Sequence, residues 1–236
     1  MNVLIPMAGM GQRFVDAGYQ EPKPLIPVLG TPMIELVVKN LGLDAHYIFI
    51  VQKSHSEKYN LHQLLKNITP SCSIIEIEGI TEGAACSTLL AKEFINKDEE
   101  LVIANSDQYV VCDTKEFINH VSNYDAGMLT FTGTNPKWSF AELDSDGYVK
   151  RVAEKDPISD VATVGIYYWR SGAEYVKYAE QMISKNIRVR NEFYVCPVFN
   201  EAIEDNKKVV THNVEEMWGL GTPEDLEQFI NARTGD

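Results

Sequence analysis

The chain has 236 residues, of which 44% are hydrophobic and 23% charged, so it can build a buried core and is neither a disordered nor a collagen-like chain. Its length fits one globular domain, or at most two. With 21 Lys and Arg against 34 Asp and Glu, the formal net charge is −13, which argues against non-specific binding to nucleic acid or to an anionic membrane.

The first residues predict a strand that starts at once. Residues 1–6 (Met-Asn-Val-Leu-Ile-Pro) lack the basic region and the long apolar region of a secretory signal. No apolar run reaches the ~18 residues of a membrane-spanning helix. The cysteines share no short spacing and include no Cys-x-x-Cys pair, so we expect reduced, mostly buried thiols in a cytoplasmic protein. They are Cys72, Cys86, Cys112 and Cys196.

Strand-like and helix-like segments alternate in the first half of the chain. Short apolar runs rich in β-branched residues predict strands at 3–5, 47–51, 74–77 and 101–104. Between them, possible capping residues predict helix starts at Thr31-Pro32, at Ser54 with Glu57, and at Asp113 with Glu116. This alternation predicts an α/β fold with a mostly parallel central sheet and helices on both faces.

The pattern changes after Asp125. Strand-like runs at 128–132, 140–143, 148–152 and 164–169 follow with few helices between them, and residues 144–147 predict a hairpin turn. We expect these strands to add an antiparallel lobe. Helices near 173–185 and 192–202, a strand near 209–212 and a helix capped by Thr222-Pro223 complete a single domain over 1–236, with halves 1–125 and 126–236.

A glycine-rich turn directly follows the first strand. Gly9 and Gly11 allow backbone N–H groups to approach an anion closely, and Arg13 adds a planar set of donors for phosphate oxygens. Phe14 stands where a dinucleotide-binding fingerprint has its third glycine, and the Gly-Lys-Ser/Thr of a P-loop is also missing. Lys23, between two prolines, lies on a stiff and extended segment suited to a fixed electrostatic role.

The run Gly-x-Gly-x-Arg, followed by Pro-Lys-Pro-Leu-Ile-Pro-Val, resembles the signature of the sugar-1-phosphate nucleotidyltransferases. The resemblance extends along most of the chain. It implies a Rossmann-like, GT-A-type fold that moves a nucleotidyl group from an NTP, bound by 1–125, onto a phosphorylated acceptor, bound by 126–236, with release of pyrophosphate. The resemblance also implies that the backbone of Met7, Ala8, Gly9 and Gly11 lies along the triphosphate. Arg13 and Lys23 would then be catalytic groups on its phosphates.

A second glycine-containing segment looks like the family's nucleobase loop. It comprises Glu82, Gly83 and Ala84, and Gly83 allows the backbone to approach a planar ring. Glu78 falls where many relatives carry a base-contacting Gln. A carboxylate only accepts hydrogen bonds, and cytosine offers an exocyclic amino donor, so the sequence favours CTP over UTP or dTTP.

Asp107 follows a buried strand and matches the family's Mg²⁺ ligand, which bridges the metal to the triphosphate. Gly219 stands where the family's second metal-binding carboxylate is expected. Either Asp107 and the phosphates hold Mg²⁺ without a second carboxylate, or a neighbour such as Glu216 substitutes. Asp225 is explained by a capping box with Thr222.

The resemblance places the acceptor on the second half of the chain. Glu154 and Lys155 resemble the family's acceptor-binding pair, in which Lys binds the acceptor phosphate and Glu a hydroxyl or amine. Arg190, Glu192 and Tyr194 are expected to face the same acceptor, although a solvated strand edge explains Arg190 equally well.

The acceptor itself is left open. The compact ending resembles short enzymes of capsule and surface-polysaccharide synthesis, including cytidylyltransferases that act on phosphocholine or phosphoglutamine. A uridylyl- or thymidylyltransferase acting on a hexose-1-phosphate is the alternative within the family. A glycosyltransferase would usually carry an Asp-x-Asp motif, which Ser106-Asp107-Gln108 is not. A nucleotide-sensing regulator without catalysis is the non-enzyme alternative, and the sequence is compatible with a homodimer.

Overall fold

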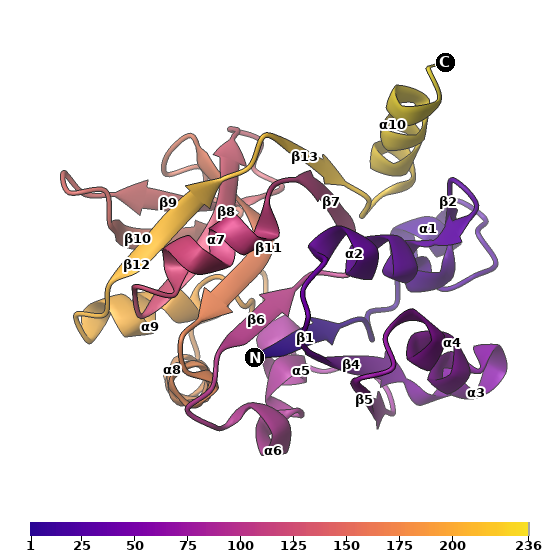
Figure 1. Ribbon diagram of the computed structural model, residues 1–236, viewed down its shortest axis with the longest axis horizontal. Helices are drawn as coiled ribbons and strands as arrows, with labels where there is room; N and C mark the ends of the chain where they lie inside the picture. Colours follow the sequence, from indigo (N-terminus) through magenta and orange to yellow (C-terminus); the bar gives the residue numbers. More distant parts are fainter. Residues whose placement is uncertain (236) are drawn as a thin grey trace.

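The computed structural model describes residues 1–235 and places most of the strands in one nine-stranded sheet (Figure 1). Its centre consists of four parallel strands in the order β6 (Leu101–Ala104), β1 (Asn2–Pro6), β4 (His46–Gln52) and β5 (Cys72–Ile77). The strands predicted in the first half of the chain are therefore confirmed. Their near-continuous apolar sequences suit a sheet that is buried on both faces.

The second half of the chain extends this sheet with antiparallel strands. β11 (Val161–Trp169) pairs with β6 on one side and with β8 (Ala126–Thr132) on the other. β9 (Ser139–Leu143) and β10 (Val149–Glu154) form the predicted hairpin beside β11, and β12 (Val209–Asn213) runs parallel to β8. The predicted change from parallel to antiparallel pairing after Asp125 is confirmed.

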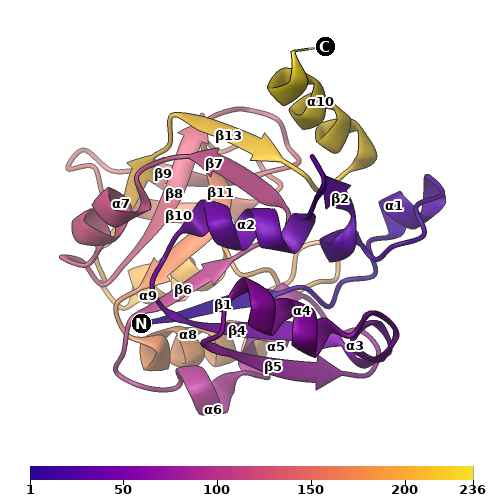
Figure 2. The same ribbon diagram turned by 45° about the vertical axis from the view of Figure 1, so that its right-hand side comes forward.

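Helices cover both faces of the sheet (Figures 1 and 2). One face packs against α2 (Met33–Leu41), α4 (Leu61–Ile68) and α7 (Thr114–Val121). The other packs against α5 (Ala84–Leu89), α6 (Lys92–Ile95), α8 (Gly172–Ser184) and α9 (Val198–Glu204). Alternate residues of each central strand enter the two cores, as the pleat requires.

A third, smaller core joins the two ends of the chain. Phe14 of α1 (Gln12–Asp16) and Phe229 of α10 (Pro223–Thr234) are both buried in it. The same region holds η1 (Lys23–Leu25) and the short paired strands β2 (Pro27–Val28) and β3 (Thr31–Pro32). Figure 2 shows α10 beside the segment that contains β2 and α1. The carboxyl-terminal helix is therefore close to the glycine-rich turn.

Two predicted helix starts differ from the structure. Thr31 and Pro32 form β3, and α2 begins after them without a side-chain cap. α3 (Lys53–Tyr59) begins before Ser54, because Gln52 is at its N-cap and sends its amide to the backbone oxygens of Ala8 and Gly79. By contrast, the caps expected at Asp113 and Thr222 are confirmed, since each side chain accepts a hydrogen bond from the first turn of its helix.

The predicted helix at 192–202 is shorter than expected. α9 starts only at Val198, after Pro197. The residues before it are not helical, because Phe193 donates its N–H to the carbonyl of Glu82 and its own carbonyl accepts from Ala85. Two strands of four residues were not predicted, namely β7 (Gln108–Val111) and its antiparallel partner β13 (Glu216–Gly219). Both lie next to Asp107 or Gly219, so they shape the site described below.

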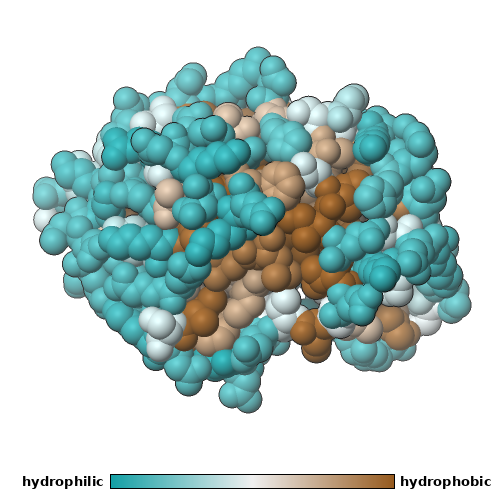
Figure 3. Space-filling model, turned by 90° about the horizontal axis from the view of Figure 1, so that it is seen from below, coloured by the Kyte–Doolittle hydropathy of each residue, from teal (hydrophilic) through white to brown (hydrophobic). Residues whose placement is uncertain are grey.

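Apolar side chains form a band on the face of the molecule seen in Figure 3. Ile80 and Leu90 are the most exposed large apolar residues near α5, at 72% and 46%. Within residues 1–235, no helix is both long and apolar enough to cross a membrane. The four cysteines are free thiols, and only Cys196 is fully buried while the others are half-buried.

Candidate active site

Two adjoining cavities lie beyond the carboxyl ends of β1 and β6, and they share Pro6 and Ala84 in their walls. The first cavity has a volume of about 390 Å³ and the second about 480 Å³. Charged residues in the wall of the first cavity are Arg13, Lys23, Asp107, Lys137, Glu154, Lys155 and Asp225. The second cavity is lined by Ala8, Gly9, Ile80, Glu82, Gly83 and Glu192, among others.

The glycine-rich turn connects the two cavities. Gly11 is in the left-handed region with φ 62°, and a Cβ atom there would lie 3.1 Å from Cβ of Lys23. Glycine at this position therefore lets the turn approach the lysine segment. Gly9 has no atom within 4 Å of a built Cβ and lines the second cavity, whereas the side chain of Met7 is buried in the core. Of the turn residues predicted to bind the triphosphate, Gly9 and Ala8 are thus in a cavity wall.

The structure brings Lys23 and Asp107 together. Nζ of Lys23 lies 2.7 Å from Oδ2 of Asp107, and the two side chains are 21% and 24% exposed. Lys23 comes from η1, and Asp107 follows β6 at the edge where a parallel sheet usually places its ligand-binding residues. Arg13 lines the same cavity from α1. The three residues predicted to be catalytic therefore line one cavity.

Gln108 supplies a group that the sequence did not single out. Its side chain is buried, its Nε2 donates to the carbonyl of Asn105, and its Oε1 has no partner among the described residues. Buried polar atoms are normally paired, so an orphaned oxygen in a cavity wall is unusual. Carboxylate and amide oxygens are the ligands that Mg²⁺ prefers. Asp107 and Gln108 fit this cation, although no cluster of three His, Cys, Asp or Glu side chains exists within 1–235.

The region around Gly219 is arranged differently from what the sequence suggested. Glu216 is exposed and accepts hydrogen bonds from Trp218 and Arg233. Met217 and Gly219 of β13 line the first cavity, and Glu216 is on the opposite face of the strand because neighbouring residues alternate. Asp225 lines the cavity instead.

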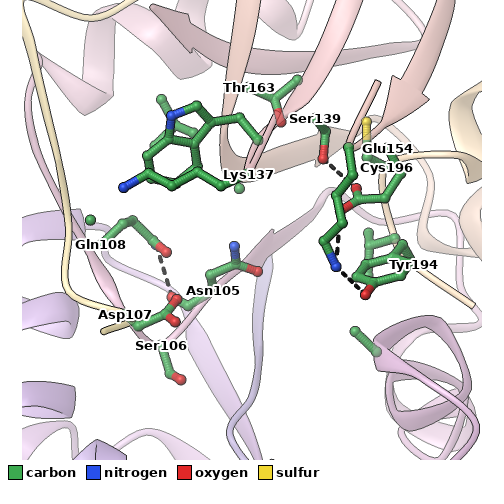
Figure 4. Close-up of a pocket in the computed structure, with 18 of the residues that line it drawn as sticks. Asn105, Ser106, Asp107, Gln108, Lys137, Ser139, Glu154, Thr163, Tyr194 and Cys196 are labelled. Carbon is green, nitrogen blue, oxygen red and sulfur yellow. Dashed lines mark hydrogen bonds and ion pairs between the residues drawn. The ribbon is translucent and has the colours of Figure 1, made fainter. Parts of the chain in front are cut away.

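Glu154, Lys155 and Tyr194 meet at the far side of the first cavity (Figure 4). The Glu154 side chain is only 8% exposed and accepts a hydrogen bond from Ser139. Burial raises the pKa of its carboxyl above the usual range, and Ser139 and Lys155 oppose that shift. Burial lowers the pKa of Lys155, which donates to the Tyr194 hydroxyl. Burial, together with nearby carboxylates, raises the pKa of Tyr194 to about 12.

The remaining predicted residues are more dispersed. Glu82 and Gly83 line the second cavity, and a Cβ on Gly83 would lie 2.4 Å from the Phe193 carbonyl oxygen. Glu192 lines the second cavity, and it also lies near enough to Glu154, Lys155 and Tyr194 to affect their pKa values. The exposed Arg190 lies outside the walls of both cavities, as does Glu78, which pairs with Lys53 and is 79% exposed. The predicted residues Met7, Gly11 and Glu216 are also absent from both walls.

Several cavity residues carried no sequence signal. Figure 4 shows Asn105 and Gln108 on one side of the first cavity, with Ser139, Thr163 and Cys196 toward the side that holds Glu154. They come from five separate strands or loops, and each residue type is common in structural roles. Only the sequence Asn105-Ser106-Asp107-Gln108 after a buried strand pointed to this wall.

Comparison with known proteins matches this architecture. A sequence model of the nucleotidyl transferase family matches residues 2–234, nearly the whole chain. The chain belongs to the nucleotidyl transferase family. The bifunctional protein GlmU of Thermotoga maritima is 25% identical over 233 residues, which cover 96% of this chain and 50% of GlmU. GlmU of Methanocaldococcus jannaschii is 26% identical over 170 residues, covering 71% of this chain and 39% of that protein. The chain spans about half or less of the length of these relatives.

Solved structures of similar proteins share the fold of this family member. The nucleoside-diphosphate-sugar pyrophosphorylase of Vibrio cholerae superposes with a TM-score of 0.82 at 23% identity, covering 97% of this chain and 99% of that one. A putative glucose-1-phosphate thymidylyltransferase of Bacillus anthracis gives 0.80 at 21% identity, covering 100% and 96%. The inositol-1-phosphate CTP transferase of T. maritima gives 0.75 at 12% identity, covering 98% and 96%. The similarity of these three structures to the chain supports a Rossmann-like fold with a mostly parallel central sheet.

Proposed function

We propose that this chain transfers a nucleoside monophosphate from an NTP to a phosphorylated small-molecule acceptor and releases pyrophosphate. The observation that carries this proposal is the first cavity itself. Arg13, Lys23 and Asp107 line this cavity together with Glu154 and Lys155. A triphosphate near Lys23 and Asp107 and an acceptor near Glu154 would have their reacting groups in the same space.

The reaction needs charge control more than proton transfer. A phosphate is already ionised at pH 7, so its oxygen attacks the α-phosphorus without a general base, in line with the departing pyrophosphate. Lys23 and Arg13 lower the repulsion between two anions and stabilise the charge that moves onto pyrophosphate. Asp107 and Gln108 would hold Mg²⁺, which supplies charge neutralisation and a template for the phosphates when it is bound.

CTP is the nucleotide that we place first. Two carboxylates, Glu82 and Glu192, line the second cavity, and both can only accept hydrogen bonds. A base with an exocyclic amino group suits such a wall better than uracil or thymine. Glu78 pairs with Lys53 outside both cavities and Glu82 pairs with Arg188, so either carboxylate would have to leave its ion pair to contact a base.

The acceptor is proposed to present a hydroxyl or amine to Glu154 and its phosphate to Lys155. The buried carboxylate favours a donor group, and the Lys155 ammonium is a suitable partner for an anion. Phosphorylated precursors of capsule or surface polysaccharide are the acceptors to test first, with hexose-1-phosphates as the alternative. We place the reaction in the cytoplasm, where free thiols such as the four cysteines are usual.

A thermal-shift panel tests the nucleotide half of this proposal. ATP, GTP, CTP, UTP and dTTP are each added with and without Mg²⁺, so no acceptor needs to be known. A nucleotide at ~100 times its Kd should add about 2.7 kcal/mol to the free energy of unfolding. Stabilisation by CTP alone supports the carboxylate argument. Stabilisation by UTP or dTTP redirects the search to hexose-1-phosphates, and no shift with any nucleotide contradicts the proposed function.

A regulator that binds nucleotide without turning it over is the second candidate. Gly219, in place of a carboxylate, is the observation that favours it. Pyrophosphate release separates the two functions. The nucleotide chosen by the thermal-shift panel is incubated with Mg²⁺ and a panel of phosphorylated acceptors, and release with any acceptor identifies an enzyme.

A further inference from the structure

The first cavity contains a second ion pair of lysine and aspartate. Nζ of Lys137 lies 2.7 Å from Oδ1 of Asp225, although 88 positions separate the residues. The Asp225 side chain is 17% exposed and that of Lys137 42%. The pair repeats the arrangement of Lys23 with Asp107 in the same cavity wall. The role that we infer for Asp225 in this wall rests on the proposed function.

Helix capping does not explain the Asp225 carboxylate. Thr222 caps α10 by accepting a hydrogen bond from the backbone N–H of Asp225, at 3.1 Å. In a reciprocal capping box the acidic side chain would return to the cap residue. Here Oδ1 of Asp225 faces Lys137 across the cavity instead. The helix start needs only the backbone of this residue, which leaves its carboxylate available for another role.

Two glycines lie against the two carboxylates. A Cβ on Gly219 would lie 3.6 Å from Oδ2 of Asp225. A Cβ on Gly221 would lie 2.9 Å from Oδ2 of Asp107, closer than real Cβ contacts allow. Asp107 and Asp225 therefore approach the same three-residue stretch of backbone, and a side chain at Gly221 would fill the place that the Asp107 carboxylate occupies.

Gln108, whose Oε1 is unpaired, lies next to the same stretch of backbone. Gln108 pairs with Gly219 in the register of β7 and β13, and its Oε1 is buried without a partner among the described residues. This amide oxygen and the carboxylates of Asp107 and Asp225 line the same cavity and form a set of hard donors. Such a set is typical of a divalent cation that also keeps waters and phosphate oxygens.

We propose that Asp225 is the second carboxylate that holds a divalent cation together with Asp107, with Oε1 of Gln108 as a third oxygen donor. Lys137 neutralises Asp225 when no metal is bound. When the metal binds, the Lys137 ammonium is displaced and is free to pair with the phosphates of the nucleotide. Two carboxylates match the charge of one divalent cation, and the displaced lysine adds a positive charge where the anionic nucleotide binds.

Calorimetric titration of nucleotide without an acceptor tests this proposal, because no turnover is involved. CTP is the probe, with UTP, dTTP, ATP and GTP run in parallel, and each is titrated in Mg²⁺ and in EDTA. The ratio of the two Kd values measures how strongly metal tightens nucleotide binding. Asp225→Asn keeps the backbone cap. Glu224→Gln is the matched control, since Glu224 is exposed in the same turn of α10 and lies outside the cavity.

We expect Asp225→Asn and Asp107→Asn each to reduce this ratio at least about tenfold, because even indirect changes around a bound metal weaken it by that much. In EDTA, Asp225→Asn should bind nucleotide more tightly than the unaltered chain, since Lys137 is no longer neutralised. Glu224→Gln should leave the ratio and both Kd values unchanged. Thermal unfolding without ligand verifies that each variant is folded.

The outcomes separate this proposal from the proposed function. If Asp107→Asn lowers the ratio and folded Asp225→Asn does not, Asp225 is not a metal ligand, whereas the proposed function stands. If nucleotide binds the unaltered chain equally well in Mg²⁺ and EDTA, the metal site is refuted. If no nucleotide binds at all, the proposed function itself fails.

Discussion

The Lys23 ammonium is 2.7 Å from the Asp107 carboxylate, and 84 positions of sequence separate the two residues. The contact joins a lysine between two prolines to the end of a buried strand, so neither partner is free to move far. A bound metal and a triphosphate would compete for these two groups. Lys23 is therefore held ready beside the position where the phosphates are expected.

Lys23→Met should lower turnover far more than nucleotide affinity. If Lys23 stabilises charge as it moves onto pyrophosphate, we expect a loss of about 10²–10³ in kcat and a much smaller change in Kd. Steady-state kinetics and calorimetry measure the two quantities. Lys39→Met is the matched control, because Lys39 is exposed and pairs only with Glu35 on α2. Equal losses in kcat and in affinity would reduce Lys23 to a binding residue.

Gly9→Ala should reduce nucleotide affinity without destabilising the fold. The position has open space around a built Cβ and no positive φ, so the free energy of unfolding should stay constant or rise by about 0.4–1 kcal/mol. The added methyl group would project where the nucleotide approaches the backbone. Urea unfolding and nucleotide titration check the two halves of this prediction. Unchanged affinity would place the triphosphate elsewhere.

Gly83→Ala should destabilise the fold itself. A Cβ there would overlap the Phe193 carbonyl oxygen at 2.4 Å, and φ is 135°, a region that favours glycine. We expect a loss of about 2–4 kcal/mol, since backbone strain and overpacking each cost about 1–3 kcal/mol. Gly79→Ala is the control. Gly79 has φ 78° but open space around a built Cβ, so this substitution adds backbone strain without a steric overlap. Equal losses in the two variants would show that the contact with Phe193 is unimportant.

Glu154→Gln should stabilise the protein at pH 8 and disable the acceptor site. Burial raises the folded-state pKa of Glu154 above its unfolded value, so its ionisation lowers stability as pH rises from about 4.5 through the folded-state pKa. Glutamine removes that penalty, and its advantage should disappear at pH 4. Glu142→Gln should instead lower the free energy of unfolding at pH 8. Arg151 and Lys150 lower the pKa of Glu142, and the substitution removes both ion pairs. Urea unfolding at both pH values measures the difference.

His212 should make the protein less stable in mild acid. Burial, followed by the nearby His120, lowers the pKa of His212 from 6.5. The unfolded state then binds a proton more readily than the folded state, so stability is lost as pH falls below about 6.5 toward the folded-state pKa. Glu116 and Asp113 oppose this shift without reversing it. His212→Gln should flatten the fall in Tm between pH 7.5 and 5.5, and an unchanged slope would rule out His212 as its cause.

The central sheet could be predicted because its signal is local. The four parallel strands are continuous apolar runs, and Asp113 and Thr222 cap helices through bonds to the next few residues. β7 and β13 were not predicted, because each has only four residues. The two strands are stabilised by pairing with each other, although about a hundred positions of sequence separate them. Short strands of this kind have no periodicity to detect.

The same distinction applies to the candidate site. Arg13, Lys23 and Asp107 belong to short motifs whose spacing is readable in the sequence, and the structure places them in one cavity. No motif links Lys137 to Asp225, because their contact arises only when the segment before β9 and the start of α10 are brought to the same cavity. Their assignment needed the packing of the third core, which joins opposite ends of the chain.

That third core also couples the first cavity to the packing of α10. Phe229 packs with its ring 5.1 Å from that of Tyr109, in the same cluster as Phe14. Because α10 carries Asp225 into the cavity wall, removing this helix would take away both a cavity residue and an apolar partner of the segment that follows the glycine-rich turn.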